Sequence, residues 1–233
     1  MKKLSFNGTR YTKGGFRLNV HATFGPGIHL VSGRVGSGKS TFALLAVGLV
    51  APEKGEITRE EISRTILSMQ FPEYHITGVS IYEEVRSWGL DERDILKNVR
   101  LTGREYDDVI SLSRGELKRL HLSCVLSSGA DLLILDEPFS ALDCTEKMAI
   151  SSAITGQRDG IVIICTHEPL WLPEVDYIWE IRDGSLIGCG TIHEAISRWS
   201  LAPERIREML AKGVVPDNIS PRALWEALCR TRE

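Results

Sequence analysis

The sequence lacks the cysteine and charge patterns that mark several common classes of protein. It contains five cysteines among 233 residues, an odd number, with no CxxC pair and no metal-binding spacing. We therefore expect reduced thiols, with Cys124 and Cys165 buried in apolar segments, rather than disulfides or a zinc site. The net charge of −3 and the pI of about 6.1 provide no basic footprint, which argues against nucleic acid as a partner.

Long hydrophobic runs are also missing. The longest uncharged apolar stretch, residues 42–51, has about half the length of a membrane span. Residues 1–11 include no apolar segment of the kind found in signal peptides. We expect a soluble chain that would reach a membrane only through a partner. With 42% hydrophobic residues, the chain can bury the core of a single domain, residues 1–233, that includes a small subdomain.

Residues 33–41, GRVGSGKST, match the phosphate-binding pattern GxxxxGK[ST]. Glycines in such a loop allow backbone N–H groups to surround phosphate oxygens, at a helix N-terminus whose dipole attracts anions. Lys39 would reach the β- and γ-phosphates, and Ser40 would offer its hydroxyl to Mg²⁺. The run IHLVSG before the loop is typical of a buried strand, and STFALLAVGLV after it of a helix. The predicted phosphate-binding residues are Gly33, Arg34, Val35, Gly36, Ser37, Gly38, Lys39, Ser40 and Thr41.

Four short apolar runs are typical of strands buried on both faces of a parallel sheet. They are IHLVS, TILSM, DLLILD and IVIICT. Each run ends on or just before a polar segment, and these segments carry Lys39, Gln70, Asp136 and His167. Ligands of open parallel sheets bind outside the carboxyl ends of the strands. The sequence therefore predicts that these four side chains meet at one edge of the sheet.

The remaining segments predict additions to this core. Periodicity becomes helical and charge increases between Gln70 and Ser113, which indicates a small helical subdomain at about 71–113. The stretch IWEIRDGSLIGCGT predicts two edge strands joined by a turn at Asp183-Gly184.

A helical extension is predicted at the C-terminal end, over about 200–233. Two amphipathic helices follow Pro203, and the second begins with Ser220 as N-cap and Pro221 at the first helical position. The apolar faces of the two helices consist of Ile206, Met209 and Leu210, and of Leu224, Trp225 and Leu228.

A P-loop alone does not distinguish kinases, GTPases, helicases and transport ATPases, but a second stretch does. The sequence SLSRGELKRLHLSCVL, residues 111–126, is followed by LLILDEPFSALD. This resembles the ATP-binding-cassette (ABC) ATPases, in which an LSGGQ or LSGGE signature precedes an aliphatic strand ending in Asp-Glu-Pro. Arg114 replaces the first glycine of the signature. The other marks of the family, in order, are Tyr11, Gln70 and Thr166-His167.

The resemblance implies an α/β fold: a P-loop core with a mostly parallel sheet flanked by helices, an antiparallel N-terminal β region and a small helical subdomain. It also implies ATP as ligand and a head-to-tail dimer with a second ABC ATPase subunit. Ser113, Arg114, Gly115 and Glu116 would face ATP held by that partner. Two alternatives stay open: Ser113 and Glu116 also fit a helix capping box, and Arg114 would either attract the γ-phosphate or point to solvent.

The resemblance assigns the chemistry to two adjacent carboxylates. Asp136 would hold Mg²⁺ together with Ser40 and, in the closed state, Gln70. Glu137 would orient and deprotonate the attacking water. The alternative for Glu137 is a surface carboxylate at a strand end.

Three further roles are implied. His167 would hydrogen-bond the γ-phosphate and fix the water, unless it is a histidine satisfied within the fold. Tyr11 would stack on adenine, with Phe16 as a rival and a core aromatic as the alternative for Tyr11. Asp143 would bridge the two subunits near the opposite nucleotide.

Within the family, MQFPEYHITGVSIYEEV after Gln70 looks like the Q-loop region of energy-coupling-factor and cobalt-type ATPases, and the tail looks like theirs. This implies an ATP-hydrolysing subunit on the cytoplasmic face of a membrane, bound to an integral membrane subunit and a substrate-binding membrane component, and importing a metal ion or vitamin. Tyr74, His75 and Trp88 would line the groove for the membrane partner, or pack within the subdomain.

Two alternative functions remain: the ATPase subunit of another ABC transporter, and a soluble ATP-gated clamp acting on nucleic acid or ribosomes. Clamps of that kind carry long coiled coils or two cassettes joined by a basic linker. The sequence contains no heptads, no repeats and no basic excess, which favours the transporter subunit.

Overall fold

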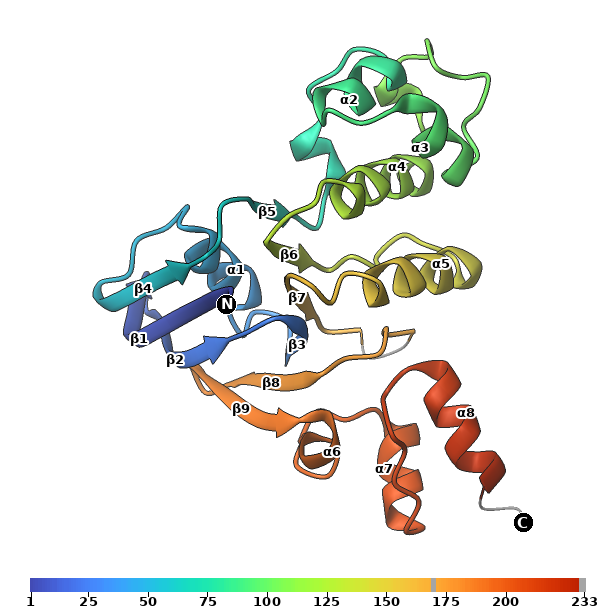
Figure 1. The fold of residues 1–233 in the computed structure, drawn as a ribbon. Helices are drawn as coiled ribbons and strands as arrows, with labels where there is room; N and C mark the ends of the chain where they lie inside the picture. The colour runs from blue at the N-terminus through green and yellow to red at the C-terminus, as the bar shows by residue number, and fades with distance from the viewer. Residues whose placement is uncertain (169–170, 231–233) are drawn as a thin grey trace.

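The computed structural model describes residues 1–168 and 171–230, which form one nine-stranded sheet with helices packed against it and a helical subdomain beyond its β5 end (Figure 1). Along the sheet the strands follow the order β4-β1-β2-β9-β8-β3-β7-β6-β5. In chain order the strands are β1 Lys3–Lys13, β2 Phe16–Phe24, β3 Gly27–Gly33, β4 Lys54–Glu60, β5 Thr65–Ser68, β6 Leu132–Asp136, β7 Ile161–Thr166, β8 Tyr177–Arg182 and β9 Ser185–Thr191. The helices are α1 Lys39–Val47, η1 Pro72–His75, α2 Ile81–Ser87, α3 Glu92–Asn98, η2 Val109–Ser111, α4 Arg114–Ser127, α5 Cys144–Thr155, α6 Ile192–Ala195, α7 Glu204–Ala211 and α8 Pro221–Arg230.

The four predicted core strands are present and parallel. β3 pairs with β7, β7 with β6, and β6 with β5, so their carboxyl ends share one edge, as predicted. β3, β6 and β7 are buried along their whole length, because helices and other strands cover both faces. The prediction of full burial was wrong for β5. This strand ends the sheet, and only Ser68 within it is buried.

The N-terminal strands form the predicted antiparallel region, in which β1 pairs with β2 and with β4. The hairpin of β8 and β9 also forms, and its turn uses positive φ at both Asp183 (φ 50°) and Gly184 (φ 69°), as a two-residue hairpin turn requires. The expectation that these are edge strands was wrong. β9 pairs with β2 and β8 pairs with β3, so the hairpin joins the antiparallel region to the parallel core.

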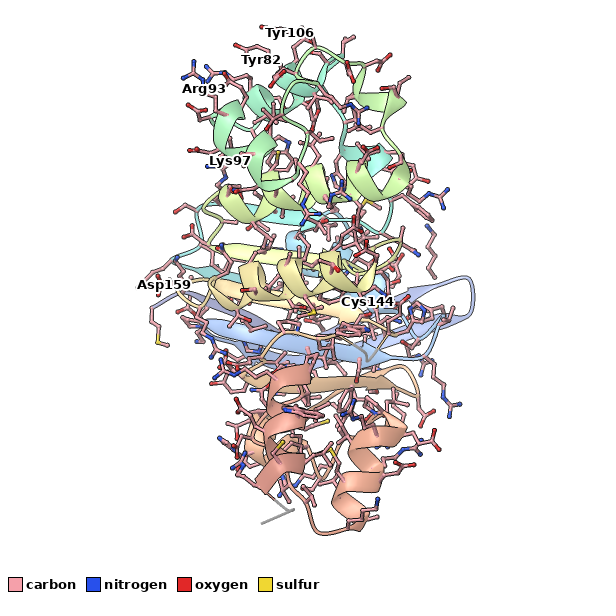
Figure 2. All side chains as sticks on the ribbon, turned by 90° about the vertical axis from the view of Figure 1, so that its right-hand side faces the viewer. Tyr82, Arg93, Lys97, Tyr106, Cys144 and Asp159 are labelled. Atoms are coloured by element: carbon pink, nitrogen blue, oxygen red, sulfur yellow. The ribbon has the colours of Figure 1, made fainter. Side chains whose placement is uncertain are left out.

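The helical subdomain lies at one end of the sheet and contains η1, α2, α3 and η2 (Figures 1 and 2). Its separate apolar cluster extends along α4 as far as Cys124. The structural unit therefore ends beyond residue 113, because one face of α4 completes the subdomain while Leu122 and Val125 pack on the main core.

The C-terminal helices lie at the opposite end of the molecule (Figure 1). Ser220 caps α8 by accepting a hydrogen bond from Ala223 N at 3.3 Å. Ile206 and Met209 are buried as expected, whereas Trp225 is 64% exposed. The segment before α7 is anchored to the sheet by Trp199, whose Nε1 donates to Ser32 Oγ at 2.8 Å. Residues 231–233 of the predicted extension lie outside the described residues.

All five cysteines are free, and burial raises the pKa of the Cys124 thiol to about 12 and raises that of the Cys165 thiol well above its ordinary value. The prediction of buried, reduced thiols at these two positions is confirmed. Over the described part of the chain, we find no helix with the length and apolarity to cross a bilayer.

Candidate functional site

The carboxyl edge of the parallel strands surrounds a cavity of about 310 Å³. Lys39, Gln70, Glu137 and His167 all line it, although they come from four separate parts of the chain. The predicted convergence of these segments is confirmed. Gly36, Gly38, Ser40 and Thr41 of the phosphate-binding loop complete one wall, together with Val35 and Phe16.

The phosphate-binding loop has the backbone expected of an anion cradle. Gly36 (φ 78°) and Gly38 (φ 107°) both take positive φ, which an L-residue adopts only at a cost. Gly38 also has no room for a side chain, because a Cβ there would lie 2.4 Å from Phe16 Cζ. No side chain caps the start of α1, and its first turn holds no acidic residue. The N-terminal N–H groups and the helix dipole therefore face an anion site.

Lys39 is buried and turned back over this loop. Its Nζ donates to Gly33 O at 3.0 Å and to Arg34 O at 3.2 Å, and lies 3.7 Å from Glu137 Oε1. A phosphate group offers such an ammonium a stronger acceptor than two neutral carbonyl oxygens do. The ammonium group of Lys39 is thus positioned beside the cavity, where a phosphate could replace the two carbonyl acceptors.

Asp136 at the end of β6 is buried, and its Oδ1 has no hydrogen-bond partner among the described residues. Burial raises the pKa of this carboxyl, while the Ser40 hydroxyl opposes the shift. An unpartnered buried carboxylate oxygen beside a serine hydroxyl fits a hard cation such as Mg²⁺. The described residues contain no group of three or more acidic, histidine or cysteine side chains placed to hold a metal, so water and phosphate oxygens would supply the remaining ligands.

Glu137 follows directly and has an unusual backbone, with φ at 50° and only 7% of the residue exposed. Its carboxylate accepts hydrogen bonds from Thr166 Oγ1 at 2.7 Å and from His167 N at 3.0 Å. The Nδ1 atom of His167 lies 2.6 Å from Glu137 Oε1. Strained backbone held by many contacts is typical of a functional position. Glu137 and His167 therefore lie in direct contact at the cavity.

The signature residues lie outside this cavity. Ser113 caps α4 and forms the predicted capping box, since its Oγ accepts from Glu116 N and its own N donates to Glu116 Oε2. Asp143 caps α5 in the same way with Glu146. Arg114 is exposed to solvent. Because the cavity and the signature are separate within one chain, the signature is free to face another nucleotide.

Tyr11 and Phe16 differ in their relation to the site. Tyr11 lies in β1 opposite Leu18 and packs against the core of the antiparallel region. Phe16, at the start of β2, lines the cavity and touches the phosphate-binding loop. Phe16, rather than Tyr11, is therefore the aromatic residue that lines this cavity.

The three residues predicted to line a docking groove are not equivalent. His75 stacks on His121 with ring centroids 4.6 Å apart, and Trp88 Nε1 donates to Glu84 Oε1 at 3.1 Å. These contacts belong to the packing of the subdomain. Tyr74 is 70% exposed and meets Phe71 edge to face at 5.9 Å. An exposed aromatic pair therefore lies directly after Gln70.

The fold and this edge define a P-loop nucleotide hydrolase with a signature helix. Comparison with known proteins agrees, since residues 18–140 match the family described as "ABC transporter". The "Energy-coupling factor transporter ATP-binding protein EcfA1" of Thermotoga maritima is 31% identical over 206 residues, covering 77% of this chain and 78% of the relative. The "Biotin transport ATP-binding protein BioM" of Rhodobacter capsulatus is 27% identical over 198 residues, covering 76% and 84%. The chain belongs to the ABC transporter family, and it is an ATP-binding, ATP-hydrolysing member.

Solved structures show the same fold. "Structure of ATP binding subunit of ABC transporter" superposes with a TM-score of 0.72 at 18% identity, covering 90% of this chain and 98% of that one. A second, "An inward-facing conformation of a putative metal-chelate type ABC transporter", has a TM-score of 0.63 at 20% identity, covering 84% and 88%.

Proposed function

We propose that this chain is the ATP-hydrolysing subunit of a membrane import complex of the energy-coupling-factor type. It would act as a dimer with a second ABC ATPase subunit on the cytoplasmic face of the membrane. The observation that carries the proposal is the exposed pair Phe71 and Tyr74, which follows Gln70 at the catalytic edge. Exposed neighbouring aromatics are typical of protein–protein contacts. The names of the relatives agree with this assignment.

The chemistry proposed at the edge is hydrolysis of the γ-phosphate by water. The loop N–H groups and Lys39 hold the phosphates, and Glu137 takes a proton from the attacking water. The water oxygen bonds to the γ-phosphorus, the bond from that phosphorus to the bridging oxygen breaks, and ADP leaves with the electron pair. His167 keeps the carboxylate of Glu137 in place through its Nδ1 and N atoms.

Asp136, Ser40 and Gln70 would hold Mg²⁺, which would supply positive charge against the negative charge that develops on the phosphate. Ser113 and Gly115 would complete the nucleotide site of the partner subunit, with Arg114 and Glu116 beside them and Asp143 near the subunit boundary. This proposal is supported by the position of the signature, which lies at the N-terminus of α4 and away from the chain's own cavity.

The transported substrate would be a metal ion or a vitamin, selected by a membrane component that this chain does not contain. The second candidate function is the ATPase subunit of an ABC transporter of another type. The catalytic edge serves both equally, and the exposed aromatic pair beside Gln70 would then meet a different membrane subunit. A soluble clamp on nucleic acid is disfavoured by the net charge of −3.

The test is co-purification from the native cell. The tagged wild-type chain should be recovered from gently solubilised membranes with a polytopic membrane protein and a small hydrophobic companion, identified by mass spectrometry. Tyr74→Glu combined with Phe71→Glu should lose these partners because the charges oppose burial of the pair. Tyr106→Glu is the matched control, since Tyr106 is 84% exposed at the tip of the same subdomain (Figure 2). Recovery of the wild type only from the soluble fraction would contradict the proposal.

A further inference from the structure

Three consecutive residues at the end of β5 are each held by a side chain from elsewhere in the fold. Ser68 Oγ lies 3.0 Å from a histidine Nε2, Met69 N donates to a histidine Nε2 at 2.9 Å, and Gln70 O accepts from a lysine Nζ at 2.9 Å. The three side chains are those of His121, His75 and Lys118, in that order. Two of them, His121 and Lys118, belong to the signature helix α4.

Lys118 is the unusual member of this set. The residue is only 1% exposed, and no carboxylate in the described part of the chain lies within 4.0 Å of its ammonium group. Its ammonium group donates a hydrogen bond to the neutral carbonyl of Gln70, 48 residues away in sequence. A buried cation without an ion-pair partner is costly, and an apolar side chain of equal length would fill the same space without that cost.

The hydrogen bond between Lys118 and Gln70 joins two functional segments of the chain. Ser113, at the N-terminus of α4, is five residues before Lys118, about 7.5 Å along the helix axis. Gln70 lines the chain's own nucleotide cavity. The bond therefore connects the helix that would serve the partner's nucleotide with the loop that would serve this chain's own.

We infer that Lys118 is a positioning residue, which fixes the backbone of Gln70 to the signature helix so that the Gln70 side chain reaches the cation beside the nucleotide. This inference rests on the proposed role of Gln70 as a ligand of Mg²⁺. In a closing dimer, a shift of α4 would carry the Gln70 backbone with it, so that engagement of the signature and completion of the cation site occur together.

The test measures cation binding directly, with Mn²⁺ in place of Mg²⁺ and a non-hydrolysable ATP analogue on the protein, by electron paramagnetic resonance. Lys118→Met keeps an unbranched side chain of similar volume, one atom shorter, and removes the donor, whereas Lys118→Arg restores a donor. We expect the Mn²⁺ dissociation constant to rise about tenfold in Lys118→Met, which is about 1.4 kcal/mol and close to the lower end of the range for a hydrogen bond from a charged group. Lys118→Arg should stay within about threefold of wild type.

Two further variants separate positioning from general stability. Gln70→Ala should weaken Mn²⁺ binding, and adding Lys118→Met to it should weaken binding no further, because no ligand is left to position. Cys124→Ala removes a fully buried side chain from the same helix without touching the Gln70 loop, so it should lower the unfolding midpoint and leave Mn²⁺ affinity unchanged. If Lys118→Met does not fold, as judged by circular dichroism, Lys118→Gln replaces it and should show a smaller rise.

Unchanged Mn²⁺ affinity in a folded Lys118→Met or Lys118→Gln variant would overturn the inference while leaving the proposed metal site intact. So would an additive loss in the Gln70→Ala background. Failure of the wild-type protein to bind Mn²⁺ with the analogue would overturn the proposed metal site, and the inference with it.

Discussion

Glu137 combines features that rarely occur in one residue: positive φ, near-complete burial and a carboxylate contacted by Thr166 and His167. The contacts offset the cost of the conformation, which is on the order of 1–3 kcal/mol for a strained non-glycine residue. The backbone is tied down as well, since Glu137 N donates to Cys165 O at 2.8 Å. The carboxylate is thereby preorganised at the cavity before any substrate arrives.

The lowered pKa of His29 predicts how the stability of the fold depends on pH. It is buried in β3, where Nε2 contacts Gly25 O at 2.9 Å and Nδ1 accepts from Trp179 Nε1 at 3.2 Å. Burial lowers its pKa to about 4, while Gly25 and Asp176 oppose the shift. The unfolded chain, with an ordinary histidine pKa near 6.5, gains its proton first as pH falls. We expect full stability above about pH 6.5 and a loss on the order of 3 kcal/mol between there and pH 4.

The measurement is the urea midpoint as a function of pH for the wild type and for His29→Gln. The glutamine amide can still donate to Gly25 O and does not titrate. The variant should therefore lose less stability at acid pH than the wild type, and the difference should equal the contribution of His29. Parallel curves for the two proteins would contradict the assignment.

At the residue scale, motif residues were predictable and long-range partners were not. Lys39, Gln70, Asp136 and His167 were placed at one edge from sequence, because each lies at or just after the end of a strand whose direction the sheet dictates. In the structure Glu137, next to Asp136, lines the cavity with the other three. Lys118 was missed, since its partner is 48 residues away and a lysine inside SRGELKRL resembles a solvated helix residue. The adenine-stacking role predicted for Tyr11 stays a prediction, and Phe16 lies closer to the loop because β2 begins beside it.

At the scale of elements, the existence of the strands was predictable, but their neighbours were not. Apolar runs identify β3, β6 and β7 correctly, because buried parallel strands need no alternation. The run TILSM, which contains β5, is similarly apolar, yet β5 is the last strand of the sheet. The β8–β9 hairpin was predicted to lie at the edge of the sheet, but both of its strands lie inside the sheet. Sheet order depends on contacts between distant segments, which local periodicity does not encode.

The turn of that hairpin provides a prediction about its glycine. Gly184 has φ of 69°, a Cβ there would lie 2.7 Å from Arg17 O, and its carbonyl accepts from Asn19 N at 2.8 Å. Gly184→Ala should therefore destabilise the fold by about 2–3 kcal/mol, from the left-handed conformation and from the displaced Arg17 strand. The change in unfolding free energy, measured by urea titration, is the readout.

Gly103→Ala is the matched control for this substitution. Gly103 also has positive φ, at 87°, but a Cβ there would meet nothing within 4 Å. It should cost only about 1 kcal/mol, from conformation alone. Equal losses in the two variants would show that the contact with Arg17 contributes nothing.

At the scale of the whole molecule, the cavity and the signature lie apart in the chain. Its own cavity lacks the signature, and its signature lies on α4 away from that cavity. The helical subdomain, which follows the end strand β5, and the C-terminal helices, which follow β9 inside the sheet, lie at opposite ends of the molecule (Figure 1). A head-to-tail pair of ATPase subunits would bring a signature to each cavity.

Conversion of bound ATP by Glu137→Gln tests the account most directly. This substitution keeps the size of the side chain and removes the base, so the variant should bind ATP, hydrolyse it about 10²- to 10⁴-fold more slowly than wild type, and stay dimeric while ATP is bound. The measurement follows bound ATP and ADP by rapid quench, with the mass of the complex recorded by light scattering. Hydrolysis at the wild-type rate would remove Glu137 from its role as the base and contradict the account.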